Sequence, residues 1–296
     1  MQKIIPHLWF DKGAVEAARW YVSLFEDSKV INISTISDTP SGESEIVDFQ
    51  LANLRFSAIS AGPYFKFNPT ISLMVACATS KEVDRLHTEL SSDGTELMPL
   101  GEYPFSKRYA WVQDKFGVNW QLMLVSNIEE HTKKIRPTLL FSGVTCGKAE
   151  EAINYYTSIF ENSNKGFTSF YADGEAMDIR AKVNYAEFNL LGTQFVAMDH
   201  GFSEDFTFNE AFSFMVMCHN QEEIDRYWDK LSFIPEAEQC GWVKDQFGLS
   251  WQIVPDYMRD ILGQGTKEEV SRVTKAFLKM KKFDLAALEK ARLGYK

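Results

Sequence analysis

Hydrophobic residues near the N-terminus change their spacing along the chain. Residues 3–10 form a short, almost continuous apolar run, which is typical of a buried strand. From Ala14 to Phe25 the apolar residues lie three and four positions apart, so we predict an amphipathic helix over residues 12–25. Three runs rich in β-branched and aromatic residues follow, separated by turn residues: 29–37, 44–52 and 54–60. The pattern therefore predicts a βαβββ module.

Residues 70–125 follow the same order. An apolar strand over 70–77 precedes a helix that we expect to begin at Ser80. A weak strand and a hairpin around the turn DKFG complete this module, with predicted strands 95–103, 107–114 and 118–125. The first part of the chain thus holds two βαβββ modules.

Three sequence blocks of the first half return in the second half, in the same order. The densest pair is WVQDKFGVNWQLM (111–123) and WVKDQFGLSWQIV (242–254), with seven identical positions. The other two pairs are 16–28 with 151–163 and 67–85 with 208–226. Because three blocks recur together, we predict two domains, 1–126 and 135–255, and four βαβββ modules in the whole chain.

Residues 256–296 belong to neither copy. Thr266 and Glu269 form a capping box before an amphipathic pattern, and we expect Asp284 to cap a last helix. This helical tail carries ten basic and six acidic residues, a net charge of +4, which leaves −14 for the rest of the chain. We therefore expect the tail to dock on its own body or on a second subunit.

Charge and composition narrow the classes of partner. The 31 basic and 41 acidic residues of the 296-residue chain give a net charge of −10 with no basic stripe, which disfavours a nucleic-acid partner. No apolar stretch has the length of a membrane span or of a signal peptide. The 4 cysteines form neither a CxxC pair nor a dense disulfide framework. We expect a cytoplasmic protein with no membrane partner.

Three stretches carry a family likeness. PHLWFDKGAVEAARWYVSLF (6–25), FKFNPTISLMVAC (65–77) and WVQDKFGVNWQLM resemble the PhnB-like branch of the vicinal oxygen chelate superfamily of glyoxalases, bleomycin-resistance proteins and extradiol dioxygenases. The tail sequence KAFLKMKKFDLAALEKA (275–291) is similar to the family's C-terminal extension. The resemblance implies an α+β fold of tandem glyoxalase-like domains. The same domain is often labelled a demethylubiquinone 3-methyltransferase.

The resemblance also implies where a metal would bind. Metal-using members have ligands on four strands, namely a His on the first, a Glu on the fourth, a His on the fifth and a Glu on the eighth. The corresponding places are Pro6, Ser57 or Ala58, Ile71 and Gln121 in the first half, and Thr138, Val196 or Ala197, Phe212 and Gln252 in the second. His7 is one place from Pro6 and so is expected on the opposite face of its strand. Neither set supplies the donors that divalent ions need, so we expect no metal.

The methyltransferase label implies a sulfonium cofactor. Such a cofactor is usually held by a glycine-rich turn between the first strand and helix of a doubly wound sheet. The sequence has no GxGxG, and ADGE and LGQG are isolated turn signals. We therefore expect no cofactor.

The repeated DKFG and DQFG turns offer two carboxylates. Asp114 and Asp245 are candidates for catalysis, but Asp at the first position and Gly at the fourth favour a type I turn. We expect the turn role, with Trp120 and Trp251 on the helix-covered face.

Alternation along the same strands places Gln121 and Gln252 on the opposite face from the two tryptophans. An amide there either hydrogen-bonds a polar ligand or is satisfied by neighbouring backbone, and the sequence does not decide between the two. Five apolar residues are further candidates for lining a ligand cleft: Leu8, Phe10, Met123, Phe67 and Phe208.

Histidine, asparagine and cysteine residues are further candidates for a functional role. His200 follows the predicted fourth strand of the second half and is a candidate acid or base, although its counterpart is Ala61. Asn68 and Asn209 join the two modules of each half, where we expect them to shape turns. Cys146 lies in an insertion and is the predicted exposed thiol.

Two classes of function, and a third role, remain open from the sequence. The first is a metal-free protein that binds a small, partly apolar compound in a cleft of each curved sheet. The second is an enzyme with the same cleft, carrying out methyl transfer, as the family label says, or proton transfer through His200, or lyase, isomerase or dioxygenase-type chemistry. The third is a scaffold that forms a homodimer, since domains of this fold often exchange modules across symmetric interfaces. Four modules in one chain would satisfy that pairing internally.

Overall fold

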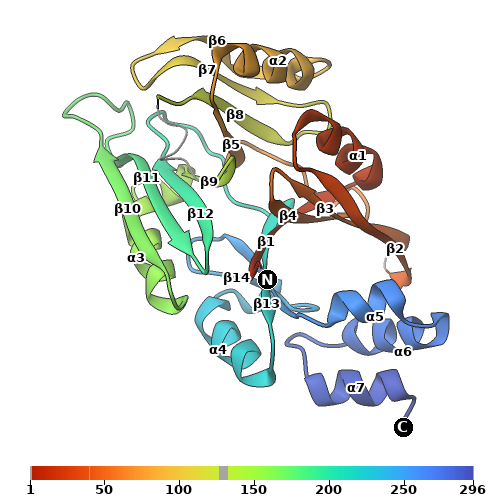
Figure 1. Ribbon diagram of the computed structural model, residues 1–296. Helices are drawn as coiled ribbons and strands as arrows, with labels where there is room; N and C mark the ends of the chain where they lie inside the picture. The colour runs from red at the N-terminus through yellow and green to blue at the C-terminus, as the bar shows by residue number, and fades with distance from the viewer. Residues whose placement is uncertain (1, 40, 127–132, 296) are drawn as a thin grey trace.

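The first half of the chain forms two βαβββ modules, as predicted. The structure is a computed structural model that describes residues 2–39, 41–126 and 133–295 (Figure 1). The first module consists of β1 (Ile4–Phe10), α1 (Ala14–Leu24), β2 (Lys29–Thr39), β3 (Gly42–Leu51) and β4 (Leu54–Ser60). The second consists of β5 (Ile71–Cys77), α2 (Ser80–Ser91), β6 (Thr95–Tyr103), β7 (Ser106–Gln113) and β8 (Asn119–Leu124). Helix α2 begins at Ser80, as predicted, and Thr79 is its N-cap, because the Thr79 side chain accepts the backbone N–H of Glu82.

The second half repeats this order with one strand fewer, so the prediction of a βαβββ order is wrong for the fourth module, which is βαββ. The third module consists of β9 (Ile135–Phe141), a short 3-10 helix (Gly143–Thr145), α3 (Ala149–Ile159), β10 (Asn164–Phe170), β11 (Val183–Leu190) and β12 (Thr193–Asp199). The fourth consists of β13 (Phe212–Cys218), α4 (Gln221–Leu231), a 3-10 helix (Pro235–Ala237), β14 (Trp242–Lys244) and β15 (Ser250–Pro255). Leu90 and Trp111 are 21 positions apart, whereas their counterparts Leu231 and Trp242 are 11 apart, so the fourth module is too short for the strand that corresponds to β6.

Each of the two sheets takes strands from both halves of the chain. The seven-stranded sheet has the order β14-β15-β13-β1-β4-β3-β2, and the eight-stranded sheet has the order β10-β11-β12-β9-β5-β8-β7-β6. The halves meet through antiparallel pairs, β1 with β13 and β5 with β9. The first module therefore pairs with the fourth, and the second pairs with the third, so modules are combined across the halves within one chain.

The two linkers between modules lock together. Asn68 Nδ2 donates to the carbonyl oxygen of Thr207 at 2.8 Å, and Asn209 Nδ2 donates to that of Lys66 at 3.0 Å. Asn68 Oδ1 also accepts the backbone N–H of Thr70 at 3.0 Å, which shapes the turn into β5. The turn role predicted for the asparagines is confirmed, and their reciprocal bonds hold the crossing of the two halves.

The predicted exposure of Cys146 is wrong. Its side chain is buried, and its Sγ lies 3.4 Å from the carbonyl oxygen of His200. The insertion folds inward because Asp199 Oδ1 accepts the backbone N–H groups of Gly147 and Ala149 at 2.9 and 3.0 Å.

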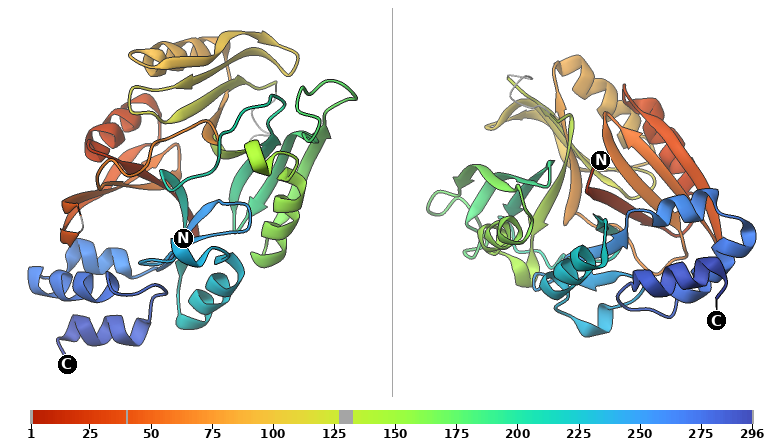
Figure 2. Two further views of the ribbon diagram at one scale, coloured as in Figure 1. Left: turned by 180° about the vertical axis from the view of Figure 1, so that it is seen from behind. Right: turned by 60° about the horizontal axis from the view of Figure 1, so that its bottom comes forward.

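Residues 256–295 form a strap across the seven-stranded sheet, which we call the C-terminal strap (Figure 1, Figure 2). It contains α5 (Met258–Gln264), α6 (Lys267–Phe277) and α7 (Leu285–Leu293). Both α5 and α6 pack on β2, at one edge of the sheet. At the other edge the backbone N–H groups of Cys240 and Gly241 donate to the carbonyl oxygens of Met280 and Lys281, both at 2.8 Å. The strap thus docks on its own body, at the edge where the fourth module lacks a strand.

The caps predicted for the strap are confirmed. Thr266 and Glu269 form the capping box of α6, and Asp284 Oδ1 accepts the backbone N–H of Ala287 at the start of α7. Among the residues that the structure describes, no helix combines the length and the apolarity needed to cross a bilayer.

Candidate functional site

A row of polar side chains crosses the seven-stranded sheet. Strand pairing aligns Asn32 with Asp48, Asp48 with Ser57, Ser57 with His7, and His7 with Ser213. These positions lie directly opposite one another on five adjacent strands, so their side chains share one face of the sheet. The row, which we call the polar row, combines residues of both halves of the chain.

The amide of Gln252 extends the polar row. Its Nε2 donates to Ser213 Oγ at 3.0 Å, and Ser213 Oγ lies 3.4 Å from His7 Nδ1. The serine hydroxyl thus bridges the amide of Gln252 and the imidazole of His7. The His7 ring also packs edge-on against Trp242, with centroids 5.6 Å apart.

The polar row, apart from the buried Ser213, lies at the floor of a cavity of about 160 Å³, which we call the covered cavity. Its walls are mainly apolar, and the C-terminal strap covers it. The lining residues from the sheet are His7, Trp9, Asn32, Ser34, Ile36, Ile46, Asp48, Ser57, Ile59, Met215, Cys240, Trp242, Gln252 and Val254, and those from the strap are Met258, Leu262, Phe277 and Phe283. A few polar groups surrounded by apolar walls are typical of a small-molecule site.

The corresponding amide in the eight-stranded sheet is engaged by its neighbours. Gln121 is 2% exposed, and its Oε1 accepts from the Tyr109 hydroxyl while its Nε2 donates to Ser72 Oγ, both at 2.8 Å. In the seven-stranded sheet, Cys240 stands two places before Trp242, where the first half has Tyr109. A thiol there cannot reproduce the phenol's hydrogen bond to the amide oxygen, so the two amides differ in what they offer to a ligand.

Burial keeps the Cys240 thiol protonated. Loss of water contact raises its pKa to about 11, so at neutral pH the thiolate is scarce. The side chain therefore acts as a small hydrophobe in the cavity wall and not as a nucleophile.

A buried ion pair fills the equivalent part of the eight-stranded sheet. Arg136 is 2% exposed, and its Nη1 donates to Glu187 Oε1 at 2.6 Å and to the Tyr185 hydroxyl at 3.0 Å. Its Nη2 lies 3.5 Å from Met74 Sδ. The matching position in β1 is Ile5. The two sheets therefore have different interiors, one with a guanidinium and the other with an aliphatic side chain at this place.

The expected metal positions shift by one residue on three strands. The floor positions at the junction of paired modules are His7, Ser57, Ser213 and Gln252 in one sheet, and Thr138, Val196, Ser72 and Gln121 in the other. The predicted positions Pro6, Ile71 and Phe212 are each one residue before a floor position, so they lie on the other face of their sheet. The prediction that His7 lies on the face opposite the site is therefore wrong. The repeat could have given the correct position, because Pro6 aligns with Pro137 in the second half and His7 therefore aligns with Thr138.

The floor residues do not fit a divalent metal ion. His7 offers one imidazole and Asp48, two strands away, one carboxylate, whereas the hydroxyls of Ser57 and Ser213 and the amide of Gln252 are neutral, so the row lacks the full set of nitrogen and carboxylate ligands of such a site. Within residues 2–39, 41–126 and 133–295, no group of three or more His, Cys, Asp or Glu side chains is placed to hold a metal.

The apolar candidates for the cleft lie elsewhere. Leu8 and Phe10 are 1% and 4% exposed and belong to the hydrophobic core, because alternation along β1 gives the cavity face to His7 and Trp9. Phe67 packs on Phe10, with ring centroids 5.1 Å apart.

The remaining two apolar candidates are also outside the covered cavity. Phe208 packs on Phe141 with ring centroids 5.2 Å apart. Met123, on β8, is half-buried in the eight-stranded sheet and pairs with Tyr109.

His200 lies outside the covered cavity too. It follows β12, half-buried near Phe202 and Phe206, with ring centroids 5.7 and 6.3 Å away. Burial lowers its pKa, because the apolar surroundings disfavour the charged ring. Its Nδ1 has no hydrogen-bond partner among the described residues.

Asp114 and Asp245 have the predicted role in a turn and a further one in the core. Asp114 Oδ1 accepts the backbone N–H groups of Phe116 and Val118, and its Oδ2 accepts the Tyr21 hydroxyl and the Trp120 indole, both at 2.8 Å. Asp245 repeats all four bonds in the second half. Burial raises both pKa values to about 6, so each carboxylate is ionised at neutral pH and accepts from four donors.

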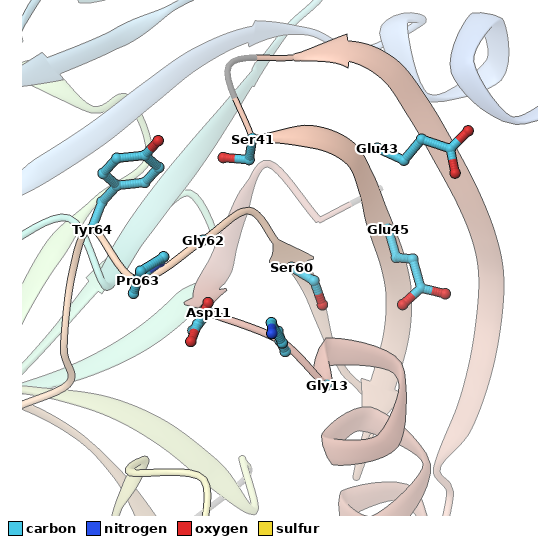
Figure 3. Close-up of a pocket in the computed structure, with 10 residues that line it drawn as sticks. Asp11, Gly13, Ser41, Glu43, Glu45, Ser60, Gly62, Pro63 and Tyr64 are labelled. Atoms are coloured by element: carbon cyan, nitrogen blue, oxygen red, sulfur yellow. The ribbon is translucent and has the colours of Figure 1, made fainter.

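A wider hollow of about 550 Å³ lies at the rim of the first module (Figure 3). Asp11, Glu43 and Glu45 line it together with Ser41 and Tyr64. Although it is larger, its lining residues come from the first module and the segment directly after it, and its charged groups are mostly carboxylates. We therefore assign the candidate site to the covered cavity, where side chains of two modules converge.

Two curved sheets, each made of two paired modules that meet at a common floor, define a protein of the vicinal oxygen chelate fold. The chain belongs to the 3-demethylubiquinone-9 3-methyltransferase family, whose sequence model matches residues 2–123 and again residues 133–254. The resemblance seen in the sequence is thereby confirmed for both halves.

Two solved structures are similar to the chain. The PhnB protein from Bacillus cereus is 40% identical over 42% of this chain and 100% of its own, with a TM-score of 0.40. Glyoxalase I from Zea mays is 11% identical over 88% of this chain and 97% of its own, with a TM-score of 0.54, which shows a shared fold alone. No curated protein matches the chain.

Proposed function

We propose that this protein binds a small, partly apolar molecule in the covered cavity of the seven-stranded sheet, without a metal ion. The observation that carries the proposal is the polar row, whose members Asn32, Asp48, Ser57 and His7 lie side by side at the floor of a mainly apolar cavity. A row of hydroxyl, carboxyl, amide and imidazole groups supplies both donors and acceptors to a ligand. The apolar walls supply the larger part of the binding energy.

The dimensions of the cavity favour a ligand with one ring. Its volume of about 160 Å³ is comparable to that of the engineered apolar cavities of about 150 Å³ that hold benzene. Trp9 and Trp242 lie in its wall with ring centroids 6.1 Å apart, and aromatic side chains pack well against a flat ring. A neutral one-ring compound with a hydroxyl and a carbonyl, such as 4-hydroxyacetophenone, has this shape and polarity.

The Gln252→Ala variant is expected to bind 4-hydroxyacetophenone about two- to tenfold more weakly than the wild type, since one hydrogen bond contributes about 0.5–1.5 kcal/mol. Calorimetric titration of the purified chain measures the change. Gln121→Ala is the matched control, because Gln121 holds the same place in the eight-stranded sheet but is engaged by Tyr109 and Ser72. If Gln121→Ala weakens binding and Gln252→Ala does not, the ligand site is in the other sheet.

Methyl transfer, the activity in the family's name, is a second candidate function that rests on the family match. Against it, both sheets mix parallel and antiparallel pairs, and neither has the doubly wound parallel order that usually holds a sulfonium cofactor.

Thermal unfolding separates these possibilities. We expect neither EDTA nor S-adenosylmethionine to change the melting temperature by more than about 1 °C. The measurement would detect binding, because a ligand at a hundred times its Kd adds about 2.7 kcal/mol to the unfolding free energy and so raises the melting temperature measurably. A rise with S-adenosylmethionine would support the transferase, and a fall with EDTA would contradict the metal-free site.

A further inference from the structure

The C-terminal strap forms one wall of the covered cavity. Phe277, at the end of α6, and Phe283, just before α7, line it together with Met258 and Leu262 of α5. The two phenylalanine rings meet edge-to-face with centroids 6.2 Å apart, and both are buried. The helices α5 and α6 of this wall pack on β2, whereas the segment between the two phenylalanines lies at the other edge, where the fourth module is too short for the strand that corresponds to β6.

Phe283 is fixed in position by the backbone around it. Its carbonyl oxygen accepts from Gln221 Nε2 at 3.0 Å, and Gln221 Oε1 accepts the backbone N–H of Leu285 at 2.9 Å. Its ring lies on Gly241, where a Cβ would come within 2.6 Å of the ring carbon Cε2. The backbone of Phe283 is therefore held in place, and on the side of Gly241 its ring has no free space to move into.

The turn that carries both rings is tied to the edge of the sheet. The backbone N–H groups of Cys240 and Gly241 donate to Met280 and Lys281, in the middle of the segment between the two phenylalanines. Two ion pairs add to this attachment, Lys281 with Glu238 at 3.0 Å and Lys282 with Asp225 at 2.7 Å. The wall is therefore held to the sheet by backbone bonds as well as by side chains.

We propose that Phe277 and Phe283 determine the specificity of the covered cavity by limiting its ligands to a single ring. The proposal rests on the function proposed above, since it concerns the same cavity. The polar row fixes where the polar groups of a ligand lie, and the two phenylalanines fix how far its apolar part extends. A fused two-ring compound with the same polar groups meets the Phe283 ring.

The experiment compares two probes by calorimetric titration: 4-hydroxyacetophenone, and 4-acetyl-1-naphthol, which keeps the hydroxyl and acetyl groups para on one ring and adds a fused second ring. The wild type is expected to bind the one-ring probe at least about tenfold more tightly than the two-ring probe. In Phe283→Ala the removed ring leaves room, so the preference is expected to fall at least about tenfold or to reverse. Phe283→Leu, which disturbs packing less, is expected to show an intermediate preference and serves if the alanine variant does not fold.

Leu288→Ala is the matched control. Leu288 is a buried residue of α7 that does not line the cavity, so its truncation loosens the strap without enlarging the site. Its ratio of the two dissociation constants is expected to equal that of the wild type. A control ratio that changes as much as that of Phe283→Ala would overturn the proposal, because general loosening would then explain the effect.

The failure of this proposal differs from the failure of the proposed function. If the wild type binds neither probe, the proposed function is contradicted for this ligand class. If the wild type binds both probes equally well, or if the Phe283 variants keep the wild-type ratio, the cavity binds ligands but its specificity lies elsewhere.

Discussion

The Asp114→Asn variant is expected to lose about 2–4 kcal/mol of unfolding free energy, since hydrogen bonds to a charged group are worth about 1.5–3 kcal/mol and an unsatisfied buried group costs about 1–3 kcal/mol. Each carboxylate oxygen of Asp114 accepts from two donors. An asparagine turns one of those oxygens into an NH₂ group, which cannot accept from either donor. The Trp120 indole or a pair of backbone N–H groups is then left buried without an acceptor.

Urea denaturation at about pH 7.5, where both carboxylates are ionised, measures the loss. Asp245→Asn is the matched variant, because Asp245 makes the same four bonds in the second half, and the two losses are expected to agree within about 1 kcal/mol. A loss below about 1 kcal/mol in both variants would show that the carboxylates do not hold the turns and helices together.

The Glu187→Ala variant is expected to lose about 3–5 kcal/mol, the usual cost of removing one partner of a buried ion pair. Arg136 is 2% exposed, so without Glu187 its guanidinium charge stays in the protein interior beside Tyr185 and Met74. Arg136→Ile introduces the residue that β1 has at the matching place. It is expected to lose less, because Glu187 is 33% exposed and its charge can be solvated by water.

Urea denaturation of the two single variants and of the double variant measures these losses of unfolding free energy. The double variant Arg136→Ile/Glu187→Ala is expected to be more stable than Glu187→Ala alone, since it leaves no unpaired charge. If Glu187→Ala loses less unfolding free energy than Arg136→Ile, the unpaired guanidinium of Arg136 reaches water, which contradicts its burial in the structure.

Much of the fold could be predicted from the sequence, because local patterns and the repeat were strong. The spacing of apolar residues indicated the strands and helices of the first half, and the DKFG turn indicated the role of Asp114. The capping box at Thr266 likewise needed only nearby residues. These features depend on neighbours in sequence, so periodicity and turn chemistry were enough to find them.

Pairing between distant strands was harder to predict. The repeat marks residues 1–126 and 135–255 as copies, but each sheet combines a module from one copy with a module from the other. The missing strand of the fourth module, and the strap that takes its place, follow from a shorter connection after α4 and from contacts that cross the whole chain. The periodicity of apolar residues within one copy indicates neither which modules pair nor where the strap docks.

The site depended on register as well as on topology. A shift of one residue moves a side chain to the other face of a sheet, so placing the first floor position on Pro6 removed His7 from the cavity. Asp48 was missed because it joins the row of His7 only through the pairing of two further strands, and Trp242 because it packs on His7 from the other half of the chain. Gln252 was found because alternation with Trp251 needs one strand alone.

The central claim is that a small molecule occupies the covered cavity, and methionine methyl resonances test it most directly. Met215 and Met258 line the cavity, whereas Met74 is buried in the eight-stranded sheet beside Arg136. In a titration of methyl-labelled protein with 4-hydroxyacetophenone, we predict saturable shifts of the Met215 and Met258 signals and no shift of the Met74 signal. Unchanged Met215 and Met258 signals at millimolar probe, or shifts confined to Met74, would contradict the account.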